Sequence, residues 1–176
     1  MARRWWLACL GLALLLVGIA YWRIGATPSL PAYVAFALLS ALLTVIDLRD
    51  KRLPNELTLV AYPALGLTLL LPSWLHGQWD AYGRAWASAA ILLVIYGVLA
   101  LASPAGLGMG DVKLAGSIGL MLGWQSWTAP LWGTALAFIL GGLASAALLI
   151  TGRAGRRTEI PFGPSMLLAA WILIGW

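Results

Sequence analysis

The sequence predicts an all-α protein, a bundle of about six or seven transmembrane helices in one domain. Of its 176 residues, 62% are apolar and 10% are charged, which is more apolar surface than a soluble domain of this length could bury. One membrane crossing takes about 20 apolar residues, so this length allows about six or seven crossings joined by short loops. We therefore expect a polytopic protein in the lipid bilayer, with its chemistry on loops or helix ends.

Seven apolar runs alternate with short stretches that are polar or carry Pro and Gly. The runs cover residues 5–22, 31–46, 57–75, 85–103, 112–124, 129–150 and 160–176. The fifth run is short for a crossing, so it could be re-entrant or tilted. The first run resembles a signal peptide, but no small-residue cleavage pattern closes it. We expect residues 1–30 to be a retained transmembrane anchor and residues 31–176 to form a single membrane domain.

The basic residues predict which end of each span faces the cytoplasm. If the amino terminus is cytoplasmic, the loops at residues 47–56, 104–111 and 151–159 lie on that side. Nine of the eleven Lys and Arg residues then fall inside, and only Arg23 and Arg84 fall outside, as the positive-inside rule requires. Many tryptophans lie near the ends of the runs, at the headgroup level. The pattern indicates a multi-pass protein of the cytoplasmic membrane.

The rare residue types exclude several kinds of site. Cys9 is the only cysteine and His76 the only histidine. The sequence therefore has no Cys-Xaa-Xaa-Cys motif, and a zinc site or a Ser/His/Asp triad would depend on one loop histidine. The net charge of +5 is better explained by membrane topology than by nucleic-acid binding. We expect no metal, no cofactor and no nucleic-acid partner.

Acidic residues gather on the predicted cytoplasmic side, and two of them stand out. Asp47 ends an apolar run, a costly place for a carboxylate unless the charge is used or satisfied. Asp111 follows three closely spaced glycines, which permit a tight turn and the close approach of another helix. Such a turn could bring Asp111 close to Asp47.

Two carboxyl groups that share a water cannot both ionise easily, because repulsion and desolvation raise the pKa of one. The ionised group can take a proton from water while the protonated group polarises a peptide carbonyl, so the pair suits peptide hydrolysis without a metal.

Two other interpretations of these aspartates remain open from the residues. Asp111 could merely cap the helix that starts at Val112. Asp50, one helical turn after Asp47, could replace it, although its basic neighbours favour a solvated charge.

Three segments resemble the type IV prepilin peptidase family. Residues 46–55, Ile-Asp-Leu-Arg-Asp-Lys-Arg-Leu-Pro-Asn, resemble its first aspartate segment. Residues 108–114, Gly-Met-Gly-Asp-Val-Lys-Leu, resemble its Gly-Xaa-Gly-Asp segment, and residues 159–164, Glu-Ile-Pro-Phe-Gly-Pro, resemble its Ile-Pro-Phe-Gly-Pro run. The three occur in the family's order on one predicted membrane face.

The resemblance implies an aspartic-type endopeptidase with Asp47 and Asp111 as the catalytic pair. Its substrates would be prepilin or pseudopilin precursors, cut at the cytoplasmic face between a short basic leader and an apolar helix. Type IV pilins, competence or secretion pseudopilins, Flp-type pilins and preflagellin-like precursors all fit. Larger members of the family carry a cytosolic insert with paired Cys-Xaa-Xaa-Cys motifs and also methylate the new amino terminus. This sequence has no such motifs, so we expect no methyltransferase activity.

The three segments also supply residues expected to support the active site or the substrate. These residues are Pro54, Asn55, Gly108, Gly110, Lys113, Pro161, Gly163 and Pro164. Lys113 could instead be an anchor at the interface, and both prolines of the last segment fit the first turn of the final span.

Two other functions remain open. The main alternative is a small membrane transporter or channel component that uses Asp47 and Asp111 to bind a cation, although the span centres lack charge. The other is a purely structural membrane subunit, for which both aspartates would be dispensable.

Overall fold

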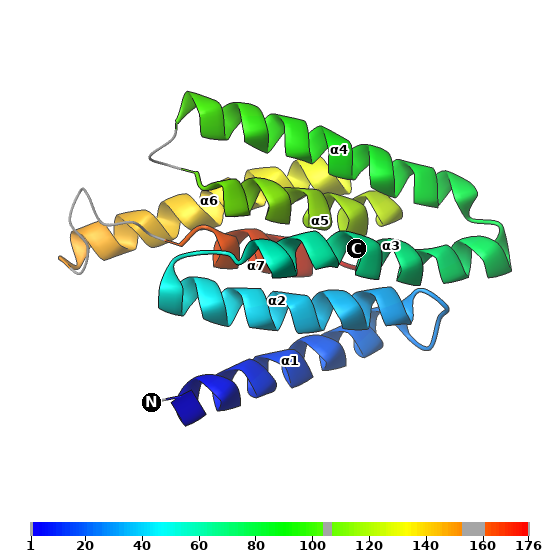
Figure 1. Cartoon of the computed structure of the whole chain (residues 1–176), viewed down its shortest axis with the longest axis horizontal. Coiled ribbons are helices and arrows are strands. Elements are labelled where there is room, and N and C mark those ends of the chain that lie inside the picture. Colours follow the sequence, from blue (N-terminus) through cyan, green and yellow to red (C-terminus); the bar gives the residue numbers. More distant parts are fainter. Residues whose placement is uncertain (1, 104–106, 153–160, 176) are drawn as a thin grey trace.

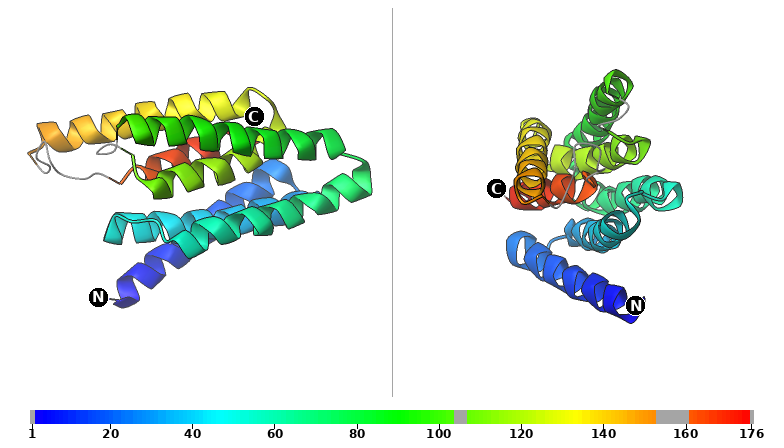
Figure 2. Two further views of the ribbon diagram at one scale, coloured as in Figure 1. Left: turned by 45° about the horizontal axis from the view of Figure 1, so that its top comes forward. Right: turned by 90° about the vertical axis from the view of Figure 1, so that its left-hand side faces the viewer.

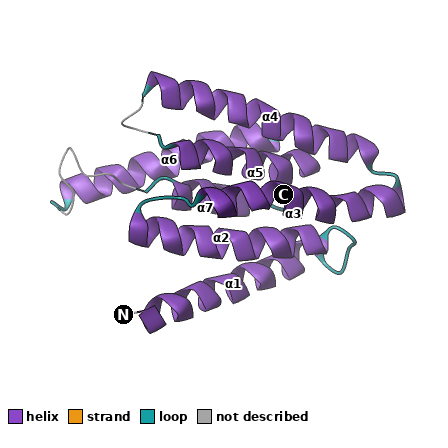
Figure 3. Cartoon of the chain, viewed as in Figure 1, coloured by secondary structure: helices purple, strands orange, loops and turns teal. Residues whose placement is uncertain are grey.

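A computed structural model describes residues 2–103, 107–152 and 161–175, and every regular element in these ranges is an α-helix (Figure 1 and Figure 3). In chain order the helices are α1 (Ala2–Ile24), α2 (Leu30–Asp50), α3 (Asn55–His76), α4 (Trp79–Ala102), α5 (Met109–Gln125), α6 (Ala129–Ile150) and α7 (Gly163–Leu173). The all-α prediction is confirmed.

Five of the described helices are long and apolar enough to cross a membrane, namely α1, α2, α3, α4 and α6. α5 has 17 residues and α7 has 11, which is fewer than the roughly 20 that a full crossing takes. Large apolar side chains such as Leu14, Leu67 and Leu101 are exposed on the outside of the bundle, as expected of a surface that faces lipid. The chain is a multi-pass membrane protein.

The short helix α5 lies inside the bundle, in contact with α3, α4, α6 and α7 (Figure 2). Residues 114–124 of α5 are all buried. Its glycines let α4 come close, because a methyl group at Gly119 would lie 2.8 Å from Cα of Ala89. Small residues at such contacts are what allow helices in membranes to pack tightly. The body of α5 is thereby fixed in position by its neighbours.

Arginines from longer helices satisfy the carboxyl-terminal ends of α5 and α7. Arg84 of α4 donates from Nε to the carbonyl of Gly123 and from Nη2 to that of Trp124, both at 2.6 Å. Arg23 of α1 donates from Nη1 to the carbonyl of Ile172 at 2.9 Å. Carbonyls at a helix end have no partner within the helix, which is costly where water is scarce. The two basic residues that the sequence assigns to the outside are therefore helix caps.

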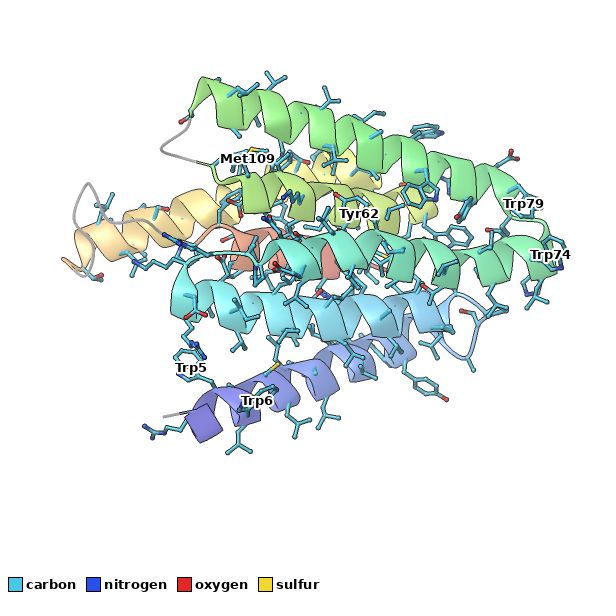
Figure 4. The ribbon with its side chains drawn as sticks, viewed as in Figure 1. Trp5, Trp6, Tyr62, Trp74, Trp79 and Met109 are labelled. Atoms are coloured by element: carbon cyan, nitrogen blue, oxygen red, sulfur yellow. The ribbon has the colours of Figure 1, made fainter. Side chains whose placement is uncertain are left out.

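Tryptophans lie at both ends of the bundle. Trp5 and Trp6 occupy the start of α1, whereas Trp74 and Trp79 lie at the opposite end, where α3 meets α4 (Figure 4). The rings of Trp74 and Trp79 meet edge to face with their centres 6.3 Å apart. Two such groups match the aromatic belts that border a bilayer.

Most helix ends differ by a few residues from the predicted runs, because an apolar run reports depth in the membrane and not backbone hydrogen bonding. α2 continues through Arg49 and Asp50, beyond the end of its run at residue 46. α4 starts at Trp79, six residues before its run. α7 starts at Gly163, so the prediction that Pro161 lies in its first turn is wrong, whereas Pro164 does lie there. Glu159 and residue 160 lie outside the described residues.

Candidate active site

The carboxyl-terminal end of α2 and the amino-terminal ends of α5 and α7 lie at the same end of the bundle (Figure 1). Asp47 belongs to the last turn of α2, and Asp111 to the first turn of α5. Both line one pocket of about 260 Å³. The structure thus brings together the two aspartates that the sequence pairs.

Asp47 is nearly enclosed, with 5% of its surface exposed. Its carboxylate Oδ2 accepts a hydrogen bond of 3.1 Å from the main-chain N–H of Gly163, the first residue of α7. Its main-chain carbonyl accepts a bond of 2.9 Å from the N–H of Lys51. Lys51 takes the left-handed conformation, φ 52° and ψ 33°, which ends α2 immediately after Asp50. Both the side chain and the backbone of Asp47 are therefore held.

Asp111 caps its own helix. Its Oδ2 accepts a hydrogen bond of 3.0 Å from the N–H of Gly108, the residue that precedes α5. Burial raises the pKa of the Asp111 carboxyl, and the hydrogen bond from Gly108 opposes that rise. Asp111 is not the N-cap of a helix that starts at Val112, as one interpretation expected, because α5 starts at Met109 and Gly108 precedes it. The hydrogen bond from Gly108 still stabilises the start of α5, and it does not exclude a second role, because Asp111 also lines the pocket.

The first turn of α5 fits against the loop after α2. A methyl group at Gly110 would lie 2.8 Å from Cβ of Leu53, so a larger residue would push the two segments apart. Met109, which lies between Gly108 and Gly110 and is labelled in Figure 4, is exposed. It belongs to the lining of the same pocket as Asp111. The glycines therefore place Asp111 by permitting a close contact.

Two hydrogen bonds tie α3 to the start of α5. The Nζ of Lys113 donates to Oδ1 of Asn55 at 2.6 Å. The hydroxyl of Tyr62 donates to the main-chain carbonyl of Lys113, also at 2.6 Å, from its place between α3 and α5 (Figure 4). Lys113 and Asn55 do not line the pocket of the aspartates among the described residues. They can support the pocket only by holding the segments that form it.

Pro54 and Asp50 face away from the aspartate pair. Both line a separate, mostly apolar pocket between the start of α1 and the end of α2. Asp50 is half-exposed and forms an ion pair of 2.8 Å with Arg49. Asp50 is thus exposed to solvent as predicted, but it lies in the last turn of α2 and not in a loop.

Sequence reasoning missed four residues that line the pocket of Asp47 and Asp111, namely Lys51, Arg52, Leu53 and Met109. Lys51 and Arg52 precede the Leu-Pro pair that stops the helix, a signal that could have placed them in a loop beside Asp47. The left-handed backbone of Lys51 has no such signal, because non-glycine residues seldom adopt it. Among the described residues, no three His, Cys, Asp or Glu side chains gather as metal ligands would.

A model of the type IV leader peptidase family matches residues 34–150. The chain is 34% identical over 137 residues to the prepilin leader peptidase/N-methyltransferase of Aeromonas hydrophila, which covers 76% of this chain and 45% of that protein. It is 35% identical over 154 residues to the protein of the same name from Escherichia coli strain K12, covering 85% and 64% respectively. The chain thus spans only about half the length of relatives of this kind.

Another relative is similar in length. Leader peptidase HopD of Salmonella typhimurium is 31% identical over 155 residues, which cover 84% of this chain and 94% of HopD. No solved structure matches the chain.

Proposed function

Because the chain belongs to the type IV leader peptidase family, we propose that it is an aspartic endopeptidase that removes the leader from prepilin or pseudopilin precursors. The observation that carries this proposal is the pocket that Asp47 and Asp111 share. We place the pocket at one end of the bundle, where the loop after α2 meets the headgroup level of the membrane. A peptide that runs from the membrane surface into an apolar helix could reach it there.

In the proposed reaction the two carboxyl groups act on one water. The ionised aspartate accepts a proton from the water, whose oxygen attacks the carbonyl carbon of the scissile peptide. The protonated aspartate donates a hydrogen bond to the carbonyl oxygen and balances the negative charge that develops on it. Transfer of a proton to the departing amine then breaks the C–N bond. Mutual repulsion in the pocket favours the required state, with one proton on the pair.

We place the pocket at the cytoplasmic face of the cell membrane, with a cytoplasmic amino terminus. Basic residues at the same end of the bundle support this orientation, among them Arg4 in α1, Arg49 in α2, and Lys51 and Arg52 in the loop that follows. Lys and Arg next to membrane spans are retained on the cytoplasmic side.

We propose peptidase activity without methyltransferase activity. The names of the Aeromonas and Escherichia relatives include both activities, whereas HopD is named as a leader peptidase alone. The sequence has one cysteine, so it cannot hold the paired Cys-Xaa-Xaa-Cys motifs that the methylating members of the family carry.

The other residues of the three segments receive supporting roles. Gly108, Gly110, Asn55 and Lys113 would position Asp111, as their packing and hydrogen bonds suggest. Gly163 and Pro164 would position Asp47 from the start of α7, and Pro161 from the segment that leads into it.

Co-expression with candidate precursors tests the function directly. The wild type is expected to remove the leader, while Asp47→Asn and Asp111→Asn each leave the precursor intact. Asp50→Asn is the matched control, because this carboxylate lies one turn from Asp47 but is half-exposed and faces the other pocket. Mass spectrometry of the new amino terminus reads out cleavage and methylation together. Cleavage by either catalytic variant, with Asp50→Asn also active, contradicts the assigned pair.

A further inference from the structure

The segment before α7 contains a glycine whose main chain touches Asp47 across 116 residues of sequence. The N–H of Gly163 donates to Oδ2 of Asp47 at 3.1 Å, and both groups are buried. As the first residue of α7, Gly163 has an N–H with no acceptor inside its own helix. The buried carboxylate and the free N–H satisfy one another.

Only glycine fits this contact. A methyl group at residue 163 would lie 2.7 Å from Oδ2 of Asp47 and 3.5 Å from its Cγ. It would also touch Cδ2 of Leu114 in α5 at 3.5 Å. The first distance is too short for any real side chain, so either the Asp47 carboxylate or the start of α7 must move. The requirement is for space beside the carboxylate, not for an unusual backbone angle.

Phe162, the residue before Gly163, packs against α6. The ring of Phe162 lies 5.2 Å from that of Phe138, centre to centre. On the same helix, a methyl group at Gly141 would lie 2.6 Å from Cε2 of Phe162, so the ring fills the space that this glycine leaves. The packing of Phe162 on α6 therefore fixes the main chain next to Gly163.

On the other side, α7 is bound to the helix that carries Asp47. The indole Nε1 of Trp171 donates to Oγ of Ser40 at 3.0 Å, and its ring stacks on Phe36 at 5.6 Å. Phe36, Ser40 and Asp47 share one face of α2, because they are four and seven residues apart. The antiparallel pair of α2 and α7 thus holds Gly163 level with Asp47.

We propose that Gly163 is a positioning residue for the proposed peptide hydrolysis, fixing Oδ2 of Asp47 through its main-chain N–H so that Oδ1 faces the shared water. This inference rests on the proposed function, since it assigns a role within that site. It makes the start of α7 a third part of the active site, beside the end of α2 and the start of α5. Gly163 itself touches no reacting atom.

Kinetics on a purified precursor test the role. Gly163→Ala is expected to lower kcat by about 100-fold, the loss expected when a reacting group is misplaced by about 1 Å, with KM changed less than about twofold. The pH dependence of kcat should change as well. Gly142→Ala in α6 is the control, because a methyl group there meets nothing within 4 Å. Wild-type kcat in a folded Gly163→Ala variant overturns the positioning role and leaves the peptidase assignment intact.

A measurement without substrate separates this role from the function and from folding. Residues 162 and 163 form the only Phe-Gly pair in the sequence. Labelling Phe with ¹³C at its carbonyl and Gly with ¹⁵N therefore selects the Gly163 amide by NMR in detergent micelles. Asp47→Asn should move this signal, because a carboxylate accepts a stronger hydrogen bond than an amide does, while Asp50→Asn should not. An unmoved signal in Asp47→Asn overturns the contact, whether or not any precursor is cut.

Discussion

The Nζ of Lys113 lies 2.6 Å from Oδ1 of Asn55, and this hydrogen bond joins the start of α3 to the start of α5. The two residues come from the two segments that carry Asp47 and Asp111, yet neither lines the pocket. The bond therefore connects the segments from outside. It holds the loop that contains Leu53 against the glycine turn before Asp111.

The first prediction concerns the hydrogen bond between Lys113 and Asn55. Asn55→Leu removes the acceptor and should lower cleavage several-fold, whereas Asn55→Asp keeps an acceptor for the ammonium and should retain most of it. The cost in unfolding free energy should be only about 0.5 kcal/mol, since the pair is exposed. Cleavage rates and thermal unfolding in detergent measure both effects. Equal cleavage rates of the two variants contradict a role of this hydrogen bond in holding the two segments together.

The second prediction separates the two roles of Asp111. At this position the side-chain oxygen of asparagine can still accept the hydrogen bond from the Gly108 N–H, whereas alanine loses it, at a cost of about 1 kcal/mol. Asp111→Asn and Asp111→Ala should both lose cleavage, but only Asp111→Ala should unfold at a lower temperature. Thermal unfolding and precursor cleavage on the same samples give the comparison. Full cleavage by Asp111→Asn would leave capping as the only function of this residue.

The third prediction concerns pH, and its sign follows from the Asp111 carboxyl, which lies outside the five helices long enough to cross a membrane. Burial raises its pKa in the folded chain. The folded state therefore binds this proton more tightly than the unfolded state does, so the contribution to stability is present at acid pH and is lost as the pH rises through the folded-state pKa.

Unfolding temperatures from about pH 4 to about pH 8 check this linkage. As the pH increases, the unfolding temperature of the wild type should fall relative to that of Asp111→Asn. Asp50→Asn serves as the comparison, because its carboxylate is half-exposed. A wild type that gains stability over Asp111→Asn with rising pH contradicts the expected sign.

The fourth prediction concerns the far end of the bundle. Arg84 donates charged hydrogen bonds to the last carbonyls of α5, so Arg84→Ala should lower the unfolding free energy by about 2 kcal/mol. The protein that remains folded should keep the wild-type kcat, because the aspartates lie at the opposite end. Arg49→Gln, which breaks only an exposed ion pair, should change stability by less than about 1 kcal/mol. A kcat that falls with Arg84→Ala in fully folded protein would contradict this separation.

Much of the fold could be predicted from the sequence, because long apolar runs broken by Pro, Gly and charged residues leave few alternatives to membrane helices. The pairing of Asp47 with Asp111 could be predicted too, since each stands where an apolar run meets a loop. The residue at which α2 ends could not be predicted, because its last turn carries Arg49 and Asp50. By hydropathy alone, these charged residues indicate a loop. The contact between Gly163 and Asp47 depends on how α7 packs on α2. The local sequence of either helix does not indicate which distant helix packs against it.

The hydrogen bond between Gly163 and Asp47 has a consequence for the order of events during synthesis. The ribosome makes α2 and α5 before α7, so a chain that is only partly inserted already carries both acids but lacks the N–H that steadies one of them. Under the proposed function, such a chain would cleave precursors poorly until α7 has packed on α2. Cleavage would therefore begin only once α7 is in place.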